Sequence, residues 1–572
     1  SFNWYLNDYW TVKGQFSVTK KYSKSEKFID PLSSKTSVTG SKDNNLAGDL
    51  YTTNGESLDW NSNAFLYYTR SFNKQHNLNV SAGWEAASGT TESTNAHYRG
   101  FPSGEFHSLN YAAEVYKKPT RTENTTRRVS VLASANYTWN DIYLVDASVR
   151  FDGSSEFGAN QKWAPFFSGG LGVNIHNYDF FKSNGYINKL KLRASYGRTG
   201  KVNFPAYAAT TMYETLFDEW YITGYGAVLK ALGNKDLTWE KTDKLSVGIE
   251  TKTFHDRLTV DFEYYYNKTI DLVNDVTLSQ TSGFSTYKDN MGQVANKGVE
   301  LKLRADIYRD RNWDVALWGN MAHNKNEILK ISDSQKAYNE RVAAYYKNEA
   351  LYQETLGLSH GAEYSVPLPQ YEEGASLTSI WAVRSLGIDP TTGKEIFLNR
   401  DGSIADKWNA AQEVVVGNTE PKCSGAFGLN LSYKNWTLFA SFLYEWGGQE
   451  YNQTLVNNVE NADLVNKNVD LRVLTDRWKK PGDIAQFKDI KDRGMTTLPT
   501  SRFVQDKALV RLNSLNVSYD FNRDWIKKHL RMNLLRLEAS TSDLINWSSI
   551  KQERGLSYPR SWKVEFSLKA QF

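Results

Sequence analysis

The sequence predicts an all-β fold, an antiparallel transmembrane β-barrel. Segments in which apolar and polar residues alternate recur from one end of the 572-residue chain to the other. A two-residue period is that of a strand with one apolar and one polar face. Short and long connections alternate between these segments, as they do between the two ends of a membrane barrel. No stretch approaches the roughly 18 uninterrupted apolar residues that a transmembrane helix needs.

The composition fits strands that have one wet face. Aromatic residues make up 14% of the chain, charged residues 23%, and the mean hydropathy is −0.58. A wide barrel combines these features because its inner wall and loops are polar. A net charge of +4 is small for this length and indicates no nucleic-acid partner. Cys423 is the only cysteine, which excludes an internal disulfide.

The alternation is clearest in a set of segments that each place apolar residues on one face. In residues 143–151, for example, Tyr143, Val145 and Val149 alternate with Asp146, Ser148 and Arg150. We count roughly sixteen or seventeen such segments in the chain. Further examples are 129–137, 189–197, 245–250, 257–266, 297–307 and 312–321.

The connections are of two kinds. Short polar turns are expected at 73–76, 139–141, 254–257, 308–312 and 433–436. Long connections are expected at 199–243, 268–296, 326–378 and 447–504. In a bacterial outer-membrane barrel the short turns lie on the periplasmic side and the long loops on the extracellular side.

The last segment tests the geometry of this interpretation. From Trp562 to Phe572 the chain covers about 33 Å as a strand, at ~3.3 Å per residue. Tilted by about 40°, such a strand rises about 25 Å, the height of the apolar band of outer-membrane barrels. The apolar face would contact lipid, and Lys563, Glu565 and Lys569 would face a wet interior. Periodicity alone leaves open a 16-stranded porin or a plugged 22-stranded transporter.

Several stretches, taken together and in order, resemble the SusC/RagA family of TonB-dependent outer-membrane transporters. The N-terminal ones are "LVDASVRFDGSSEFGANQKWAPFFSGGLGVNI" (144–175), "LKLRASYGRTG" (190–200), "NKDLTWEKTDKLSVGIE" (234–250), "YYNKTIDLV" (265–273) and "NMGQVANKGVELKL" (290–303). The C-terminal ones are "WAVRSLGIDPTTGKEIFLNRDG" (381–402), "VVGNTEPK" (415–422), "RWKKPGD" (477–483), "SRFVQDKALVRLNSLNVSYDF" (501–521) and "YPRSWKVEFSLKAQF" (558–572). Each motif is weak by itself, whereas their shared order is specific.

The resemblance implies a 22-stranded barrel around a plug domain, in the outer membrane of a Gram-negative bacterium. It implies energy from the TonB–ExbB–ExbD complex and a SusD-like surface lipoprotein as a lid. Members of the family import glycans or peptides that are too large for porins. Oligosaccharides are the preferred substrate class here, and peptides, as in RagA, are the alternative. The resemblance also gives the C-terminal aromatic, Phe572, a role in recognition of the last strand during barrel assembly.

The sequence departs from the family at its start, where residues 1–100 resemble the middle of a barrel. No TonB box and no stretch resembling the plug is found. We therefore expect residues 1–572 to be the C-terminal portion of a single TonB-dependent transporter barrel, holding roughly sixteen or seventeen of the expected 22 strands.

No catalytic, cofactor or metal site is expected. The eight histidines are scattered without metal-ligand spacing. The stretch 387–397 has an acid–Gly–acid spacing, but Asp-Pro followed by Thr-Gly is interpreted as a reverse turn rather than a calcium loop.

Aromatic residues in the long connections are the candidate binding residues. Rings stack on sugars or prolines, and neighbouring carboxylates accept hydrogen bonds from hydroxyls. The alternative is that the rings pack within their own loops. Trp436, Tyr444 and Trp446, near strand ends, are interpreted as membrane-interface residues. The candidates for contact with substrate or lid are Trp220, Tyr221, Tyr225, Tyr345 and Tyr346.

Two other classes of protein remain as alternatives. A secreted all-β carbohydrate-active enzyme would pack the apolar faces of its strands against one another in a soluble core. It offers no reason for the alternating loop lengths or the terminal phenylalanine. A passive porin agrees with the strand count but not with the series of family-like motifs.

Overall fold

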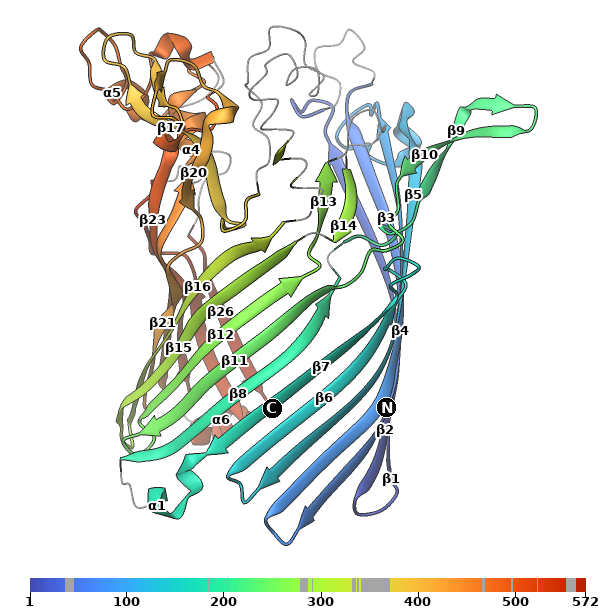
Figure 1. Cartoon of the computed structure of the whole chain (residues 1–572), viewed down its shortest axis with the longest axis vertical. Coiled ribbons are helices and arrows are strands. Elements are labelled where there is room, and N and C mark those ends of the chain that lie inside the picture. The colour runs from blue at the N-terminus through green and yellow to red at the C-terminus, as the bar shows by residue number, and fades with distance from the viewer. Residues whose placement is uncertain are drawn as a thin grey trace.

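One curved antiparallel sheet dominates the computed structural model (Figure 1). The structure describes residues 1–36, 46–182, 186–202, 204–277, 286–290, 292–331, 336, 339–340, 371–465, 469–494, 497–521, 523–551 and 562–572.

The sheet has 18 strands, each paired mainly with its neighbours in the chain. The first nine are β1 (Phe2–Tyr5), β2 (Trp10–Ile29), β3 (Asp49–Phe72), β4 (His76–Arg99), β5 (Glu114–Trp139), β6 (Tyr143–Ser154), β7 (Trp163–Asn174), β8 (Ile187–Lys201) and β11 (Glu240–Thr253). The others are β12 (Leu258–Ile270), β15 (Gln293–Arg309), β16 (Trp313–Lys330), β21 (Cys423–Tyr433), β22 (Trp436–Tyr451), β23 (Val504–Asp520), β24 (Leu534–Thr541), β25 (Asn546–Ser548) and β26 (Val564–Gln571).

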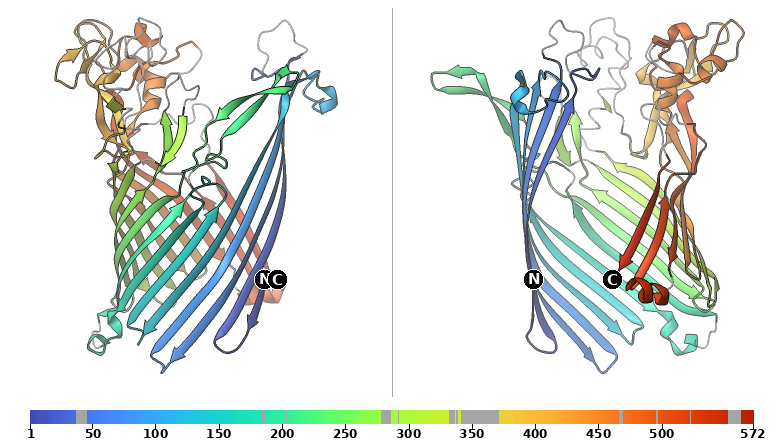
Figure 2. Two further views of the ribbon diagram at one scale, coloured as in Figure 1. Left: turned by 45° about the vertical axis from the view of Figure 1, so that its right-hand side comes forward. Right: turned by 180° about the vertical axis from the view of Figure 1, so that it is seen from behind.

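The sheet is 17 strands wide, in agreement with the number predicted. Strands β24 and β25 pair with successive stretches of the same strand, β23, and therefore occupy one position in the sheet. The 18 strands thus fill 17 positions. Strands β1 and β26 form the two edges, and among the described residues they do not pair with each other. Figure 2 (right) shows these edges facing one another across the open side of the wall.

The predicted turns and loops lie at opposite ends of the sheet (Figure 1). All five predicted short turns join paired neighbours, for example β3 to β4 and β5 to β6. The first of these places Asn73 and Lys74 at positive φ, 49° and 58°. The long connections extend from the other end, so the predicted sorting of loop lengths is confirmed.

Smaller elements lie outside the sheet. Two hairpins and a four-stranded sheet occupy the long connections: β9 (Met212–Tyr221) with β10 (Gly224–Ala231), β13 (Val273–Thr277) with β14 (Thr286–Asn290), and β17 (Ser379–Ile388), β18 (Glu395–Leu398), β19 (Ile404–Ala405) and β20 (Glu413–Asn418). The helices are η2 (Leu109–Tyr111), η3 (Ile175–Asn177), α1 (Asp179–Lys182), η5 (Ala410–Gln412), α4 (Gln453–Leu455), η6 (Val456–Glu460), α5 (Arg472–Thr475), η7 (Ile490–Gly494), η8 (Ser501–Phe503) and α6 (Arg523–Leu530). None of the helices in the described part of the chain is long and apolar enough to span a membrane.

The two faces of the sheet differ as the alternation predicts. On β6, Val149 and Phe151 are 59% and 48% exposed, although both are apolar. Between them, Arg150 turns to the other face and forms an ion pair with Glu85 of β4. An apolar face exposed over many strands is suited to lipid, and in the described part of the chain no second sheet packs against it as the secreted-enzyme alternative requires.

Strands β3, β4 and β5 have 24 to 26 residues each, and β5 extends well beyond its predicted segment 129–137. Beyond the apolar band they continue as polar ladders, in which for example Thr90 and Thr125 share a hydrogen bond of 3.1 Å between their hydroxyl oxygens. Main-chain pairing maintains these extensions where neither face is apolar. The sequence prediction stopped at the band because it relied on the apolar face.

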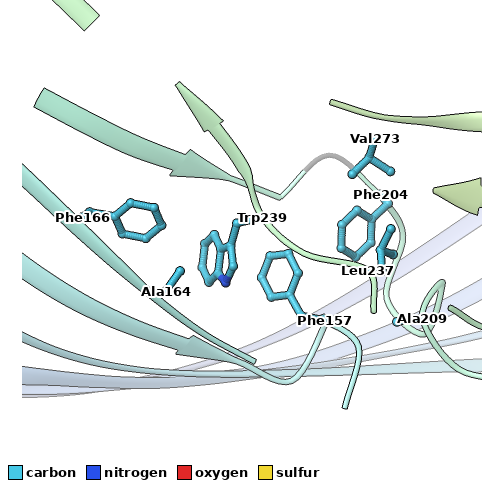
Figure 3. Close-up of a cluster of buried hydrophobic side chains, with 8 residues drawn as sticks. All are labelled: Phe157, Ala164, Phe166, Phe204, Ala209, Leu237, Trp239 and Val273. Carbon is cyan, nitrogen blue, oxygen red and sulfur yellow. The ribbon is translucent and has the colours of Figure 1, made fainter. Parts of the chain in front are cut away.

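A buried cluster near the loop end of the wall joins two of the family-like stretches (Figure 3). Phe157 from 144–175 stacks on Trp239 from 234–250, with ring centroids 4.2 Å apart. The Gly158 amide donates to the Leu237 carbonyl at 3.1 Å, and a Cβ at Gly158 would lie 2.1 Å from the Lys235 carbonyl oxygen. The two stretches, although far apart in the sequence, therefore pack tightly against each other.

Candidate functional site: the inner wall and the extracellular rim

Ion pairs cross the polar face of the sheet from strand to strand. Arg193 of β8 reaches over β11 to Asp261 and Glu263 of β12, at 2.8 and 2.7 Å. Lys189 pairs with Glu250 of β11 at 2.6 Å. The polar face thus carries charges that are paired with carboxylates on neighbouring strands. This face is therefore a hydrophilic wall that water and polar solutes wet.

The same polar face continues over β4, β5 and β6. Arg150 lies 3.0 Å from Glu85 and donates to the Ser130 hydroxyl at 2.9 Å. Nearby, Ser81 and Ser134 share a hydrogen bond of 2.8 Å between β4 and β5. Charged and hydroxyl groups therefore line this side of the wall as well.

Toward the loop end, amide side chains attach the incoming loop segment to the wall. Glu420 accepts a hydrogen bond from the Asn326 backbone amide at 3.1 Å and another from the Asn324 side chain. Asn324 and Asn326 both donate to the Asn296 side-chain oxygen. The Tyr265 hydroxyl donates to Asn324 at 2.9 Å. This network orders the rim on which the long connections stand.

A compact extracellular subdomain stands on this rim, and we define it as residues 379–420 together with the described residues 452–465, 469–494 and 497–503. Its central ion pairs join three segments: Arg502 lies 2.9 Å from Glu395 and 2.7 Å from Glu460, and all three side chains are at least nine-tenths buried. Burial disfavours the charged form of Arg502, but the two carboxylates outweigh that effect and raise the pKa of Arg502. Arg477 donates to the Val473 and Lys488 carbonyls, at 3.0 and 2.9 Å.

A buried carboxyl group gives the subdomain a predicted pH dependence. Burial, only partly offset by the charge of Arg400, raises the pKa of Glu413 to about 7. The folded state therefore holds a proton that the unfolded state releases near pH 4.5. The contribution of Glu413 to the free energy of unfolding is fully present below about pH 4.5 and falls as the pH rises toward 7, by at most about 3 kcal/mol at 1.36 kcal/mol per pKa unit.

We therefore expect Glu413→Gln to stabilise the subdomain at pH 8 and to remove the part of the pH dependence that comes from Glu413. Hydrogen exchange, corrected for the intrinsic effect of pH on amide exchange, measures the stability of the subdomain at each pH. Glu372 is exposed, and Glu372→Gln is the matched control. It should change neither the stability of the subdomain nor its pH dependence. Equal exchange in wild type at pH 5 and pH 8 would show that water reaches the Glu413 carboxylate.

The structure places part of the predicted aromatic set together. In the β9–β10 hairpin, Trp220 is opposite Tyr225 and Tyr221 is opposite Gly224. The hairpin projects outward from the rim of the wall (Figure 1), and Tyr225 is exposed. Tyr345 and Tyr346 lie outside the described residues. Contact of any of these rings with a substrate or a lid stays a prediction.

Other predicted features lie as follows. Phe572 directly follows the edge strand β26 and is exposed, and its role in assembly stays a prediction. The Asp389 carboxylate accepts hydrogen bonds from Thr391 and Thr392 in the turn between β17 and β18, so the predicted reverse turn is present. Among the described residues, no group of three or more His, Cys, Asp or Glu side chains could hold a metal ion.

Sequence reasoning missed the extracellular subdomain and its buried ion pairs. Glu395 and Glu460 are 107 and 42 residues from Arg502 in the chain, so no local pattern connects them. The family-like stretches 381–402, 477–483 and 501–521 were the available indication, because they contain Glu395, Arg477 and Arg502.

Comparison with known proteins gives a consistent result. The family model "TonB dependent receptor-like, beta-barrel" matches residues 1–540. TonB-dependent receptor P39 of Formosa agariphila is 26% identical over 90% of this chain and 53% of its own length. TonB-dependent receptor SusC of Bacteroides thetaiotaomicron is 30% identical over 42% of this chain and 25% of its own length.

The fold also matches solved structures. The RagAB peptide transporter superposes with a TM-score of 0.81 at 22% identity, covering 100% of this chain and 61% of that one. A second RagAB structure, in the "open-open" state, gives 0.80. The chain spans about half the length of curated relatives such as receptor P39. The chain belongs to the TonB-dependent receptor-like β-barrel family, a family of outer-membrane transporters that includes the SusC and RagA types.

Proposed function

We propose that the protein imports large nutrients across the outer membrane of a Gram-negative bacterium, energised by the TonB–ExbB–ExbD complex. The observation that carries this proposal is the family match over residues 1–540. The hydrophilic, internally paired inner wall supports it, because a polar cargo must pass a wetted surface. The family consists of transporters rather than enzymes.

Residues 1–572 would form the barrel part of a longer transporter. Relatives that match about nine-tenths of this chain are about twice as long. The plug domain and the segment that contacts TonB would then belong to sequence outside residues 1–572.

Oligosaccharides are our first candidate substrate, and peptides are the second. The first rests on the resemblance to SusC-type importers and on rings interleaved with carboxylates in 213–226. The second is favoured by the fold match to the RagAB peptide transporter. A SusD-like lipoprotein would cover the extracellular mouth. Trp220, Tyr221, Tyr225, Tyr345 and Tyr346 would contact the substrate or this lid.

Two measurements test the proposal. Uptake of labelled oligosaccharide by cells should stop when TonB is deleted, and uptake that continues would indicate a passive channel instead. Calorimetry on the purified full-length protein with its lipoprotein should detect oligosaccharide binding and no binding of a peptide mixture. Binding of peptides alone would replace the first substrate candidate by the second.

A further inference from the structure

Strand β21 stops short of its neighbours and leaves a wedge in the wall. It begins at Cys423, which pairs with Trp446 of β22, and its pairing with β16 ends at Ala322. Strands β16 and β22 continue beyond this point, to Lys330 and Tyr451. A cavity of about 590 Å³ fills the wedge. Its lining includes His323, Lys325, Lys422, Trp446 and Gln449.

An apolar groove adjoins this cavity on the lipid-facing side of the sheet. The groove has a volume of about 490 Å³ and is lined by Phe427, Tyr444, Trp446, Val510 and Trp547. In the ladders Val510 is opposite both Tyr444 and Trp547, so these side chains share one face. Trp446 is 69% exposed and lines both hollows, so the groove and the cavity lie next to each other.

The groove lies at the extracellular end of the apolar band. At the opposite end of β22, Trp436 packs against Tyr519 with ring centroids 4.8 Å apart. From Trp436 to Trp446 the strand covers about 33 Å, or about 25 Å of height when tilted by about 40°. Trp436 and Trp446 thus mark the two membrane interfaces, where tryptophan is enriched. The cavity above Trp446 is at the level of lipid headgroups.

Basic side chains surround the cavity on the same outer face. Leu317 of β16 is exposed on the outer face. His323 and Lys325 are an even number of residues further along the same strand, so the two-residue period places them on this face too, and both are exposed. The Lys422 ammonium makes no ion pair with a described residue, and its stem packs against Gly447, a bulge residue at φ 78°. Lys325 shares the Glu327 carboxylate with Lys297, at 3.5 and 3.7 Å.

Of the two acidic residues that line the cavity, Glu420 is turned to the wall and Asp506 is exposed on the outer face. Glu420 accepts from Asn324 and Asn326, and Asp506 accepts from the Gln449 amide at 3.1 Å. Lys507 lies 3.3 Å from both Glu445 and Glu450. On the outer face around the cavity, the ammonium groups of Lys297, Lys325 and Lys422 outnumber the carboxylates of Glu327 and Asp506, so the net charge there is positive.

We propose that the wedge and the groove together bind a phosphorylated, acylated lipid of the outer leaflet. An acyl chain would lie in the groove between Trp446 and Trp547, and a phosphate would lie between Lys325 and Lys422. Lysine is a common phosphate ligand, and an amphiphile needs an apolar and a cationic subsite side by side. The inference depends on the outer-membrane location of the family and not on the transported substrate.

Native mass spectrometry of the full-length protein, purified from nanodiscs that contain bis-phosphorylated lipid A, tests the proposal. We expect a retained lipid adduct that falls at least tenfold in Lys325→Glu/Lys422→Glu and in Trp446→Ala. The matched controls are Lys480→Glu, in the extracellular subdomain, and Trp163→Ala, an exposed tryptophan stacked on Phe151 outside the groove. Both should retain the adduct.

The arms of the experiment separate the sources of binding. Fully dephosphorylated lipid A should bind at least tenfold less, and equal retention would overturn the role of the lysines. Millimolar inorganic phosphate should not displace the lipid, and displacement would assign the site to free phosphate. Equal adduct loss in the control variants would overturn a specific site. Heat-modifiable electrophoretic mobility confirms that each variant has folded.

Discussion

Arg502→Met should unfold the extracellular subdomain locally while leaving the barrel folded. The substitution leaves Glu395 and Glu460 buried without their shared cation, and breaking a buried ion pair from one side costs about 3–5 kcal/mol. At about 1.4 kcal/mol per factor of ten, amide protection should fall at least a hundredfold. Hydrogen exchange measures this protection at the backbone amides of Trp478 and Phe487, which donate hydrogen bonds to carbonyls within the subdomain.

The exposed pair of Arg121 and Glu92 provides the matched control. Its atoms are also close, at 2.6 Å, but the side chains are 60% and 36% exposed. Arg121→Met should therefore cost less than about 1 kcal/mol. Adding Glu395→Gln and Glu460→Gln to Arg502→Met should restore part of the lost protection. A loss below about 1 kcal/mol for Arg502→Met would mean that water reaches the carboxylates.

The barrel wall was predictable because every strand repeats the same two-residue rule. Apolar residues such as Val145 and Val149 face lipid, and the polar turn 139–141 returns the chain. Both features are local in sequence, so the number of strands and the sorting of loops followed from them. The polar extensions of β3, β4 and β5 were not predicted, since above the membrane the pattern that marks a strand is absent.

The rim and the subdomain depend on contacts between distant segments. The chain has 64 acidic and 68 basic residues, so the pairing of Arg502 with Glu395 cannot be selected by spacing. The wedge above β21 exists because this strand begins only at Cys423. The apolar–polar alternation does not change at Cys423, so the sequence pattern does not mark where the strand begins. Trp446 was interpreted as a membrane-interface residue, and its place between two hollows could be seen only from the register.

The second large effect on stability distinguishes the lipid-facing side of the sheet from the lumen-facing side. Ala147 lies on β6 midway between Tyr143 and Phe151, on the face that we assign to lipid, and the next residue, Ser148, faces the lumen. Ala147→Arg should destabilise the barrel by about 2–4 kcal/mol, the cost of arginine at the bilayer midplane. Ser148→Arg should cost less than about 1 kcal/mol, chiefly the loss of its 2.7 Å hydrogen bond to Ser168.

Urea titration of the full-length protein in lipid vesicles, followed by heat-modifiable electrophoretic mobility, measures both variants. Ala147→Leu is the control for side-chain size and should leave the midpoint unchanged or raise it, because leucine is favourable in lipid. The two arginine variants differ by one position in the chain and share the same added charge. Only the face on which the charge lies distinguishes them, so equal or reversed effects would show that the lipid-facing and lumen-facing sides have been assigned wrongly.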